Sequence, residues 1–138
     1  MRATDVALLI LRLTLAIVLW PHGAQKALGL FGGPGLSGTV GMLSGHMGLP
    51  PVLIYLVIAV EFLGPIALVI GVLTRLAALG VAIDMAAAAI LVHAPNGFFM
   101  NFAGNQKGEG IEYFIYAVGI ALALVVAGSG RAAVLPKT

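Results

Sequence analysis

The chain has 138 residues, of which 61% are hydrophobic and only 9% are charged, and its formal net charge is +2. A water-soluble domain needs far more polar surface than this, so we expect an integral membrane protein. The small positive charge rests on few groups, so no nucleic-acid partner is expected. The absence of cysteine excludes disulfides, thiol catalysis, cysteine-bound iron–sulfur clusters and covalently attached c-type haem.

Four apolar segments approach the length of about 20 residues that crosses a bilayer core, and they predict four membrane-spanning helices. They cover residues 5–24, 51–73, 75–94 and 109–127. A Pro-Pro pair at 50–51 opens the second segment, and Pro-Asn-Gly at 95–97 stops the third. Only Thr74 separates the second segment from the third, so these two are expected to form a tight hairpin. We therefore predict a single all-α domain, an up-down-up-down four-helix bundle in the membrane.

The two longer links carry different signals. Residues 27–50 are rich in glycine, with apolar residues spaced through LSGTVGMLSGHMG, and this pattern predicts a short helix lying in the membrane interface. Residues 95–108, PNGFFMNFAGNQKG, mix phenylalanine with Asn and Gln. Aromatic side chains of this kind suit the depth of the lipid headgroups.

Basic residues near the ends of the spans predict the orientation, because cytoplasmic loops carry an excess of Lys and Arg. One side would carry Arg2, Arg75, Arg131 and Lys137, and the other Lys26 and Lys107. Four against two places both termini in the cytoplasm. The N-terminal stretch MRATDVALLI is interpreted as a retained span, since Arg12 interrupts the apolar run that a cleaved leader would have.

Three ionisable residues fall at similar predicted depths inside the spans. By helical rise, Arg12, Glu61 and Asp84 lie roughly 10, 15 and 14 Å from the starts of their spans. Charges in hydrocarbon are costly and need partners, so we expect Arg12 to bridge Glu61 and Asp84 in a buried ion network. In a second interpretation one carboxyl holds or moves a proton, because the two acids outnumber the base. The sequence leaves both interpretations open.

A second polar set is expected at the opposite, extracytoplasmic mouth of the bundle, where the predicted topology brings the ends of three spans together. Its members are His22, Lys26, His93, Glu109, Glu112, Tyr113 and Tyr116. Such a set can bind a quinone head group or, as a weaker alternative, a haem held between His22 and His93. No metal site is predicted, because no tight ligand spacing such as HExxH occurs.

Several of these residues also have ordinary structural interpretations. Lys26 can snorkel to the membrane interface, and Tyr113 and Tyr116 can serve as interfacial or packing aromatics. His46 is expected to be solvated in the glycine-rich link. Glu109 is expected in the first turn of the last span, where the helix N-terminus favours a negative charge.

Asp84 and His93 lie nine residues apart in the third predicted span. At 100° per residue this spacing is half a turn out of phase. A regular helix therefore cannot direct both side chains toward the bundle axis, and the sequence does not indicate which of them faces inward.

In combination, several motifs resemble the DoxX family. RLTLAIVLWPHGAQK at 12–26 is similar to its first-helix signature, an Arg followed by an HGxxK element, and VEFLGPIALVIGVLTR at 60–75 resembles its ExxG…GxxTR element. GLP at 48–50, MAAA at 85–88 and GSG at 128–130 also fit. The resemblance spans nearly the whole chain. The residues that match the pattern are Arg12, His22, Gly23, Lys26, Glu61, Gly64 and Arg75.

The resemblance implies a four-helix protein of a bacterial or archaeal inner membrane. DoxX-like proteins are often labelled oxidoreductases, DoxD-type relatives are linked to electron transfer from thiosulfate to quinone, and others associate with detoxifying redox enzymes. Because this chain has no cysteine, it cannot itself carry out dithiol chemistry. A redox role would therefore require a quinone, a haem or a partner protein.

The leading hypothesis is an oxidoreductase subunit of the membrane whose extracytoplasmic pocket holds a quinone. His22, Glu112 or Tyr116 would hydrogen-bond or protonate the quinone oxygens, and Lys26 would stabilise developing negative charge. The expected catalytic and cofactor-binding residues are His22, Lys26, His93, Glu112, Tyr113 and Tyr116.

Two other functions are compatible with the sequence. In the first, the chain is a non-catalytic membrane anchor or accessory subunit of a larger complex, and its two long links are docking surfaces. In the second, it is a small transporter with a proton path through Glu61 and Asp84. The lipid bilayer is the expected partner in every case, and redox partner proteins or an oligomer are compatible with each function.

Overall fold

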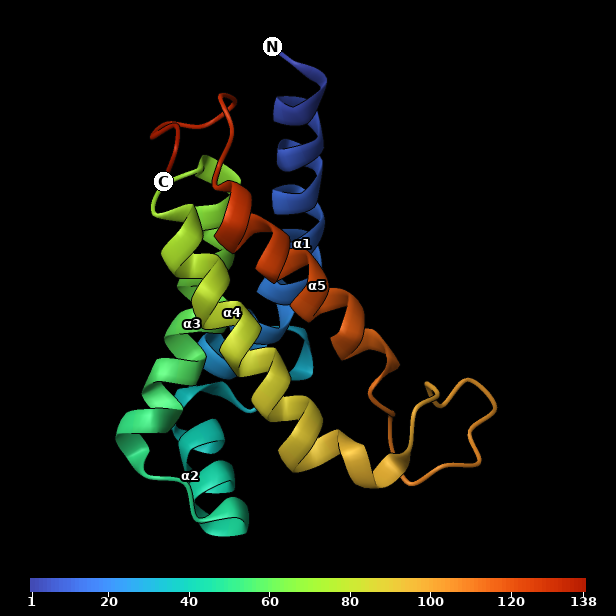
Figure 1. The fold of residues 1–138 in the computed structure, drawn as a ribbon. Coiled ribbons are helices and arrows are strands. Elements are labelled where there is room, and N and C mark those ends of the chain that lie inside the picture. Colours follow the sequence, from blue (N-terminus) through green and yellow to red (C-terminus); the bar gives the residue numbers. More distant parts are fainter.

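The computed structural model describes residues 1–138 and contains helices and loops but no β-strand (Figure 1). The all-helical class predicted from the sequence is therefore confirmed. The α-helices are α1 (Ala3–Leu28), α2 (Gly35–Met47), α3 (Pro51–Ile70), α4 (Thr74–Ala88) and α5 (Glu112–Ala127). Three short helical turns, Leu30–Gly32, Ala89–His93 and Ala94–Asn96, complete the helical structure.

Three helical segments are long and apolar enough to cross a membrane, namely Ala3–Leu28, Pro51–Ile70 and Thr74–Asn96. The third combines α4 with the two short turns that follow it. α5 is also apolar but has only 16 residues, which corresponds to about 24 Å of helix and is shorter than a typical bilayer core. These helices identify the chain as a membrane protein.

The long helices contact one another in a closed order. α1 packs on α3, α3 on α4, α4 on α5, and α5 returns to α1. α2 packs against α1 and α3 at one end of the molecule, whereas both chain termini lie at the other end (Figure 1). We call these the cavity end and the terminal end.

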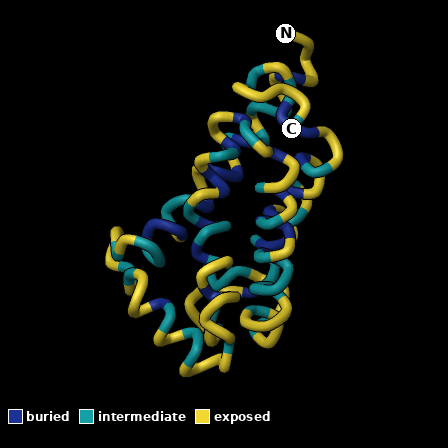
Figure 2. The backbone as a smooth tube through the Cα atoms, turned by 90° about the vertical axis from the view of Figure 1, so that its left-hand side faces the viewer, coloured by how far each residue is buried: buried dark blue, intermediate teal, exposed yellow.

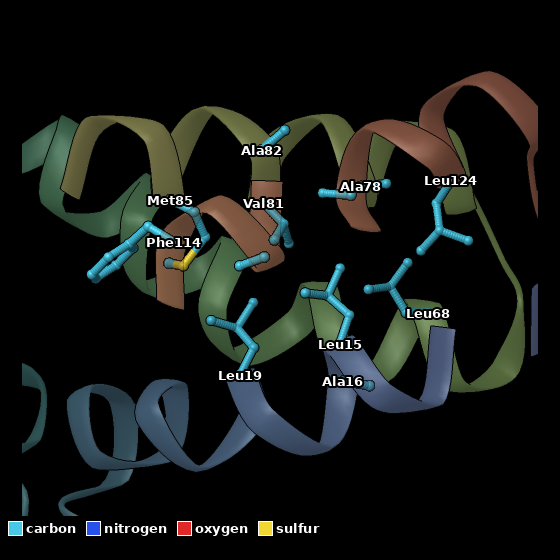
Figure 3. Packing of buried hydrophobic residues seen from close by; sticks show 12 residues of the cluster. Leu15, Ala16, Leu19, Leu68, Ala78, Val81, Ala82, Met85, Phe114 and Leu124 are labelled. Carbon is cyan, nitrogen blue, oxygen red and sulfur yellow. The ribbon is translucent and has the colours of Figure 1, made fainter. Parts of the chain in front are cut away.

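The core lies where the four long helices face one another. Leu15 and Leu19 of α1 meet Leu68 of α3, Val81 of α4 and Phe114 of α5 in one buried cluster (Figure 3). Buried residues lie mainly between neighbouring helices, and exposed residues cover the outside and the ends (Figure 2). Much of this outer surface is apolar, as expected for helices that contact lipid chains rather than water.

Several predicted boundaries are corrected by the structure. α1 extends through Lys26 to Leu28, four residues beyond the predicted end at 24. α3 ends at Ile70 because Gly71 adopts the left-handed conformation, with φ of 72°, that terminates many helices. Three residues, 71–73, therefore connect α3 to α4 in place of the single Thr74 that the sequence predicted.

The helix expected to begin at 109 begins at Glu112 as α5, because the preceding residues fold back on the loop that follows Asn96. Backbone hydrogen bonds join Gly110 N to Phe99 O at 3.1 Å and Ile111 N to Gly97 O at 3.0 Å. The helix predicted within residues 27–50 is present as α2. Its location in the membrane interface stays a prediction.

Candidate functional site

A cavity of about 390 Å³ lies among α1, α3, the end of the α4 segment and the start of α5. We call it the polar cavity. It is lined by Leu19, His22, Lys26, Glu61, Met85, Ala88, His93, Met100, Glu109, Tyr113 and Phe114. The predicted gathering of His22, Lys26, His93 and Tyr113 is therefore observed. Ionisable and apolar side chains therefore line the same cavity.

Gly23 fixes the position of α1 against α3 at this cavity. It is buried, and a Cβ atom at this position would overlap with the backbone carbonyl of Glu61. Only a glycine permits this approach of the two backbones. Lys26 follows on the same side of α1 about one turn later, and its side chain therefore reaches the Glu61 carboxylate.

Lys26 and Glu61 form an ion pair with a distance of 2.5 Å between Nζ and Oε2. The Glu61 side chain is 6% exposed and that of Lys26 is 26% exposed, so the carboxylate is the deeper member of the pair. Lys26 therefore holds a buried charge and does not simply snorkel to the interface. An ammonium group has three donors, and one of them is occupied by Glu61.

Asp84 lies beside Glu61 across the contact between α3 and α4. Gly64 of α3 faces the Val81 side chain of α4, and a Cβ at Gly64 would lie 3.8 Å from Val81 Cγ2. The two helices run in opposite directions (Figure 1). Glu61 lies three residues before Gly64 and Asp84 three residues after Val81, so the two acids lie at the same height along the helix pair. The two carboxyl groups are therefore neighbours across this helix contact, and the buried Oδ2 of Asp84 has no hydrogen-bond partner.

His93 reaches the polar cavity because the third span is not a regular helix. Residues Ala89–His93 form a π-helical turn, which is wider than an α-helical turn and changes the rotation of the residues after it. Asp84 can therefore interact with Glu61 while His93 lines the cavity. The conflict predicted for these two residues applied only to a regular helix, and the π turn removes it.

The His93 ring is held by two contacts. Its Nδ1 lies 2.9 Å from the backbone carbonyl of Glu109, and because a carbonyl oxygen only accepts, Nδ1–H is the donor of this hydrogen bond. The ring also packs on Phe114 with 4.5 Å between centroids. The imidazole therefore connects the end of the third span to the start of the fourth.

Two glutamates that the sequence placed at the pocket instead close the loop before α5. Glu112 Oε2 accepts a hydrogen bond from Met100 N at 3.1 Å, and Glu109 Oε2 accepts one from Asn101 N at 2.5 Å. Glu109 also lines the cavity, whereas Glu112 does not. The predicted place of Glu112 in the pocket is corrected, because its side chain does not line the cavity and its Oε2 binds the loop backbone.

Tyr116 is a second correction. Its side chain is 70% exposed, and it does not line the cavity. One helical turn separates it from Glu112, so both lie on the face of α5 that turns away from the cavity. Tyr113 follows Glu112 in α5 and lies on the neighbouring face, and its side chain lines the cavity.

The predicted ion network of Arg12 with Glu61 and Asp84 is wrong, because Arg12 binds only backbone carbonyl groups. Its Nε and Nη atoms donate to Leu68 O, Val69 O, Ser129 O and Ala132 O at 2.7 to 2.9 Å. Glu61 lies level with Gly23, eleven residues from Arg12 or about 16 Å along the helix. The prediction measured the depth of Arg12 from the expected span boundaries at 5 and 24, whereas α1 extends beyond both of them, from Ala3 to Leu28.

The remaining residues complete the comparison with the sequence. His22 lines the cavity, whereas His46 is exposed near the end of α2 and takes no part in it. Leu19 and Met100 were not predicted to line the site. Leu19 could have been found from its spacing of three and seven residues to His22 and Lys26, which marks one helix face. No group of three or more His, Cys, Asp or Glu residues could hold a metal ion.

Comparison with known proteins identifies the family. The model of the DoxX family matches residues 7–94. A Bacillus subtilis (strain 168) protein named "Putative oxidoreductase CatD" is 28% identical over 125 residues, which cover 89% of this chain and 81% of that protein. No solved structure matches. The motifs at 12–26 and 60–75 lie within the matched region, and the chain belongs to the DoxX family.

Proposed function

We propose that this DoxX-family protein is a membrane subunit of a redox system and that its polar cavity binds the head group of a quinone-type molecule. The observation that carries the proposal is the Lys26–Glu61 ion pair set in the wall of a largely apolar cavity. The name of the Bacillus relative supports a redox role. The family match supports the membrane setting.

The cavity suits a quinone ring in size and in chemistry. Its volume of about 390 Å³ lies within the range of pockets that hold small organic ligands. Leu19, Met85 and Phe114 offer apolar contacts to a flat ring, and Lys26 offers a charged donor to a carbonyl oxygen. A bound quinone would supply two-electron, two-proton redox chemistry.

The residues of the chain would orient the head group and supply protons. Lys26 would donate a hydrogen bond to one carbonyl oxygen while Glu61 keeps the ammonium in place. His22 and Tyr113 line the same cavity and carry groups that can donate or accept protons. Electrons would reach this site from a redox partner protein.

The proposal includes an arrangement in the membrane of a bacterium or archaeon. α1, α3, Thr74–Asn96 and α5 would cross the inner membrane as an up-down-up-down bundle, with both termini in the cytoplasm. The closed order of helix contacts and the termini at one end support this arrangement (Figure 1). Arg2, Arg75, Arg131 and Lys137 would then face the cytoplasm.

Binding of a short-chain benzoquinone to the purified protein in lipid nanodiscs tests the proposed ligand. Calorimetry should show saturable binding of one quinone per chain. Lys26→Met should weaken it by about tenfold or more, because a charge-assisted hydrogen bond is lost. The double variant Lys26→Met, Glu61→Gln avoids leaving a buried charge without a partner and should bind equally weakly.

Tyr116→Phe is the matched control, because it removes a hydroxyl from the same end of the molecule but outside the cavity. It should bind the quinone with wild-type affinity. Absence of saturable binding, or wild-type affinity in both Lys26 variants, would contradict the proposed ligand.

An accessory role remains the alternative, and the loop between the third and fourth spans favours it. Phe99 and Phe102 on this loop are 68% and 91% exposed. Purification in gentle detergent distinguishes the two functions. Stable partner chains with no quinone binding would support an accessory subunit, whereas quinone binding by the isolated chain would support the proposed ligand.

A further inference from the structure

The charged groups at the inner wall of the polar cavity do not balance. Lys26 from α1 faces Glu61 from α3, and Asp84 from α4 lies next to Glu61. The other titratable groups that line the cavity are His22, His93, Glu109 and Tyr113. Glu109 and His93 are engaged by the loop before α5, through Asn101 N and the Glu109 carbonyl, respectively. Arg12 cannot contribute, because it is bound at the terminal end. Two carboxyl groups therefore share one permanent cation.

One oxygen of the half-buried Asp84 side chain also lacks a hydrogen-bond partner. Its Oδ2 atom is buried and accepts no hydrogen bond. An ionised carboxylate without donors is very costly in an apolar environment. A neutral carboxylic acid could instead donate a hydrogen bond to the neighbouring Glu61 carboxylate, and the cluster of Lys26, Glu61 and Asp84 would then be electrically neutral.

We propose that Glu61 and Asp84 hold one proton between them and that this carboxyl pair is the proton-exchange site of the polar cavity. Glu61 lines the cavity, whereas Asp84 does not line it and neighbours Glu61 across the contact between α3 and α4. When the Asp84 O–H bond breaks and an O–H bond forms on Glu61, the proton moves to the cavity wall and the net charge of the cluster is unchanged. Asp84 is thus a positioning residue that stores the proton.

The proton pair is independent of the quinone, whereas its exchange with a ligand rests on the proposed function. Infrared spectroscopy of the ligand-free protein in lipid nanodiscs tests the pair directly. At neutral pH, the spectrum should contain the carbonyl-stretch band of a protonated carboxylic acid, and the band should shift in D2O. Asp84→Asn should abolish the band, because Glu61 then remains ionised beside Lys26.

The chain has only five acidic side chains, so the band can be assigned by substitution. Glu109→Gln and Glu112→Gln are matched controls at the same end and should leave the band unchanged. Lys26→Met should increase its area about twofold, because neutrality without the cation takes two protons. This variant provides the test if Asp84→Asn does not fold.

The outcomes separate this inference from the proposed function. A wild-type spectrum without the band would overturn the shared proton, even if a quinone binds. A band that Asp84→Asn leaves intact, or that Lys26→Met does not increase, would overturn it as well. If the band behaves as expected but no quinone binds, the proposed ligand is wrong and the proton pair stands.

Discussion

Buried charged side chains have different kinds of partner at the terminal end and at the cavity end of this protein. At the terminal end, the Arg12 guanidinium is 1% exposed, and four backbone carbonyls accept its hydrogen bonds. At the cavity end, Lys26 pairs with Glu61, and one buried oxygen of the nearby Asp84 has no partner. A buried charge whose hydrogen bonds are satisfied holds a fold together, whereas a partly satisfied charged group beside a cavity indicates a function.

The terminal end is stabilised through the C-termini of its helices. The last carbonyls of a helix have no partner within the helix, and a cation placed there is favourable. Arg12 binds Leu68 and Val69 near the end of α3. Arg75 binds Val125 and Val126 near the end of α5, at 2.6 and 2.7 Å. Each arginine therefore caps a helix that belongs to another part of the chain.

The chain after α5 returns to the end of α3 and completes this arrangement. Val134 N donates to Ile70 O at 3.0 Å, and Leu135 N donates to Gly71 O at 3.1 Å. Arg12 also binds Ser129 O, at 2.7 Å. Residues 128–138 are therefore fixed on the helices, with Arg12 as the common donor.

The largest expected effect is the loss of Arg12. Arg12→Met leaves four buried or partly buried carbonyls without their donor. Hydrogen bonds to charged groups contribute about 1.5–3 kcal/mol each, so unfolding in detergent micelles should become easier by about 3 kcal/mol or more. Thermal and denaturant unfolding measure this change.

Arg131→Met is the matched control for Arg12→Met. Arg131 also carries a positive charge at the terminal end, but its side chain is exposed and only its backbone N–H is bound, to Asp5 Oδ1. It should unfold like the wild type. Equal stability of the two variants would show that the Arg12 hydrogen bonds contribute little, and the contrast between the two ends would then not hold.

A smaller effect is expected from Gly23→Ala at the cavity end. The added methyl group overlaps with the Glu61 backbone, so α1 and α3 must separate, at a cost of about 1–3 kcal/mol. The shift also moves Lys26 from Glu61, so quinone affinity should fall together with stability. Calorimetry and thermal unfolding on the same preparation test both effects.

Gly119→Ala is the control for Gly23→Ala. This helical glycine of α5 has open space at its Cβ position, and alanine favours a helix over glycine. Its stability and quinone affinity should match or exceed those of the wild type. If Gly23→Ala behaved in the same way, the close approach of α1 to α3 would not position the ion pair.

Hydrophobic length predicted the helices well, because it depends on composition over many residues. The runs that predicted the four spans all became helices, and α2 appeared within residues 27–50. The gathering of His22, Lys26 and His93 followed from helix order alone. Features that depend on summed apolar character or on topology could therefore be predicted from one sequence.

Pairing between charged residues was predicted less well, because it depends on one or two residues of register. Arg12 was expected to pair with Glu61, so the ion pair of Glu61 with Lys26 was missed. The acceptors of Arg12 are backbone carbonyls, which every residue type carries, so no sequence pattern indicates them. The π turn at Ala89–His93 also has no pattern in the run of alanines before it. The ion pair and the π turn set the chemistry of the cavity.

The smallest perturbation tests which side of the membrane each end faces. Because the chain has no cysteine, Asn105→Cys and Pro136→Cys each introduce a single thiol at an exposed position, one in the loop before α5 and one near the C-terminus. In intact bacterial cells, a membrane-impermeant maleimide should label Asn105→Cys, whereas Pro136→Cys should react only after permeabilisation. The reverse result would place the polar cavity and its carboxyl pair nearer the cytoplasm, and protons would then reach Glu61 from that side. Labelling of both thiols in intact cells would contradict the four-span arrangement, because α5 is the one helix between the two positions and it would then not cross the membrane.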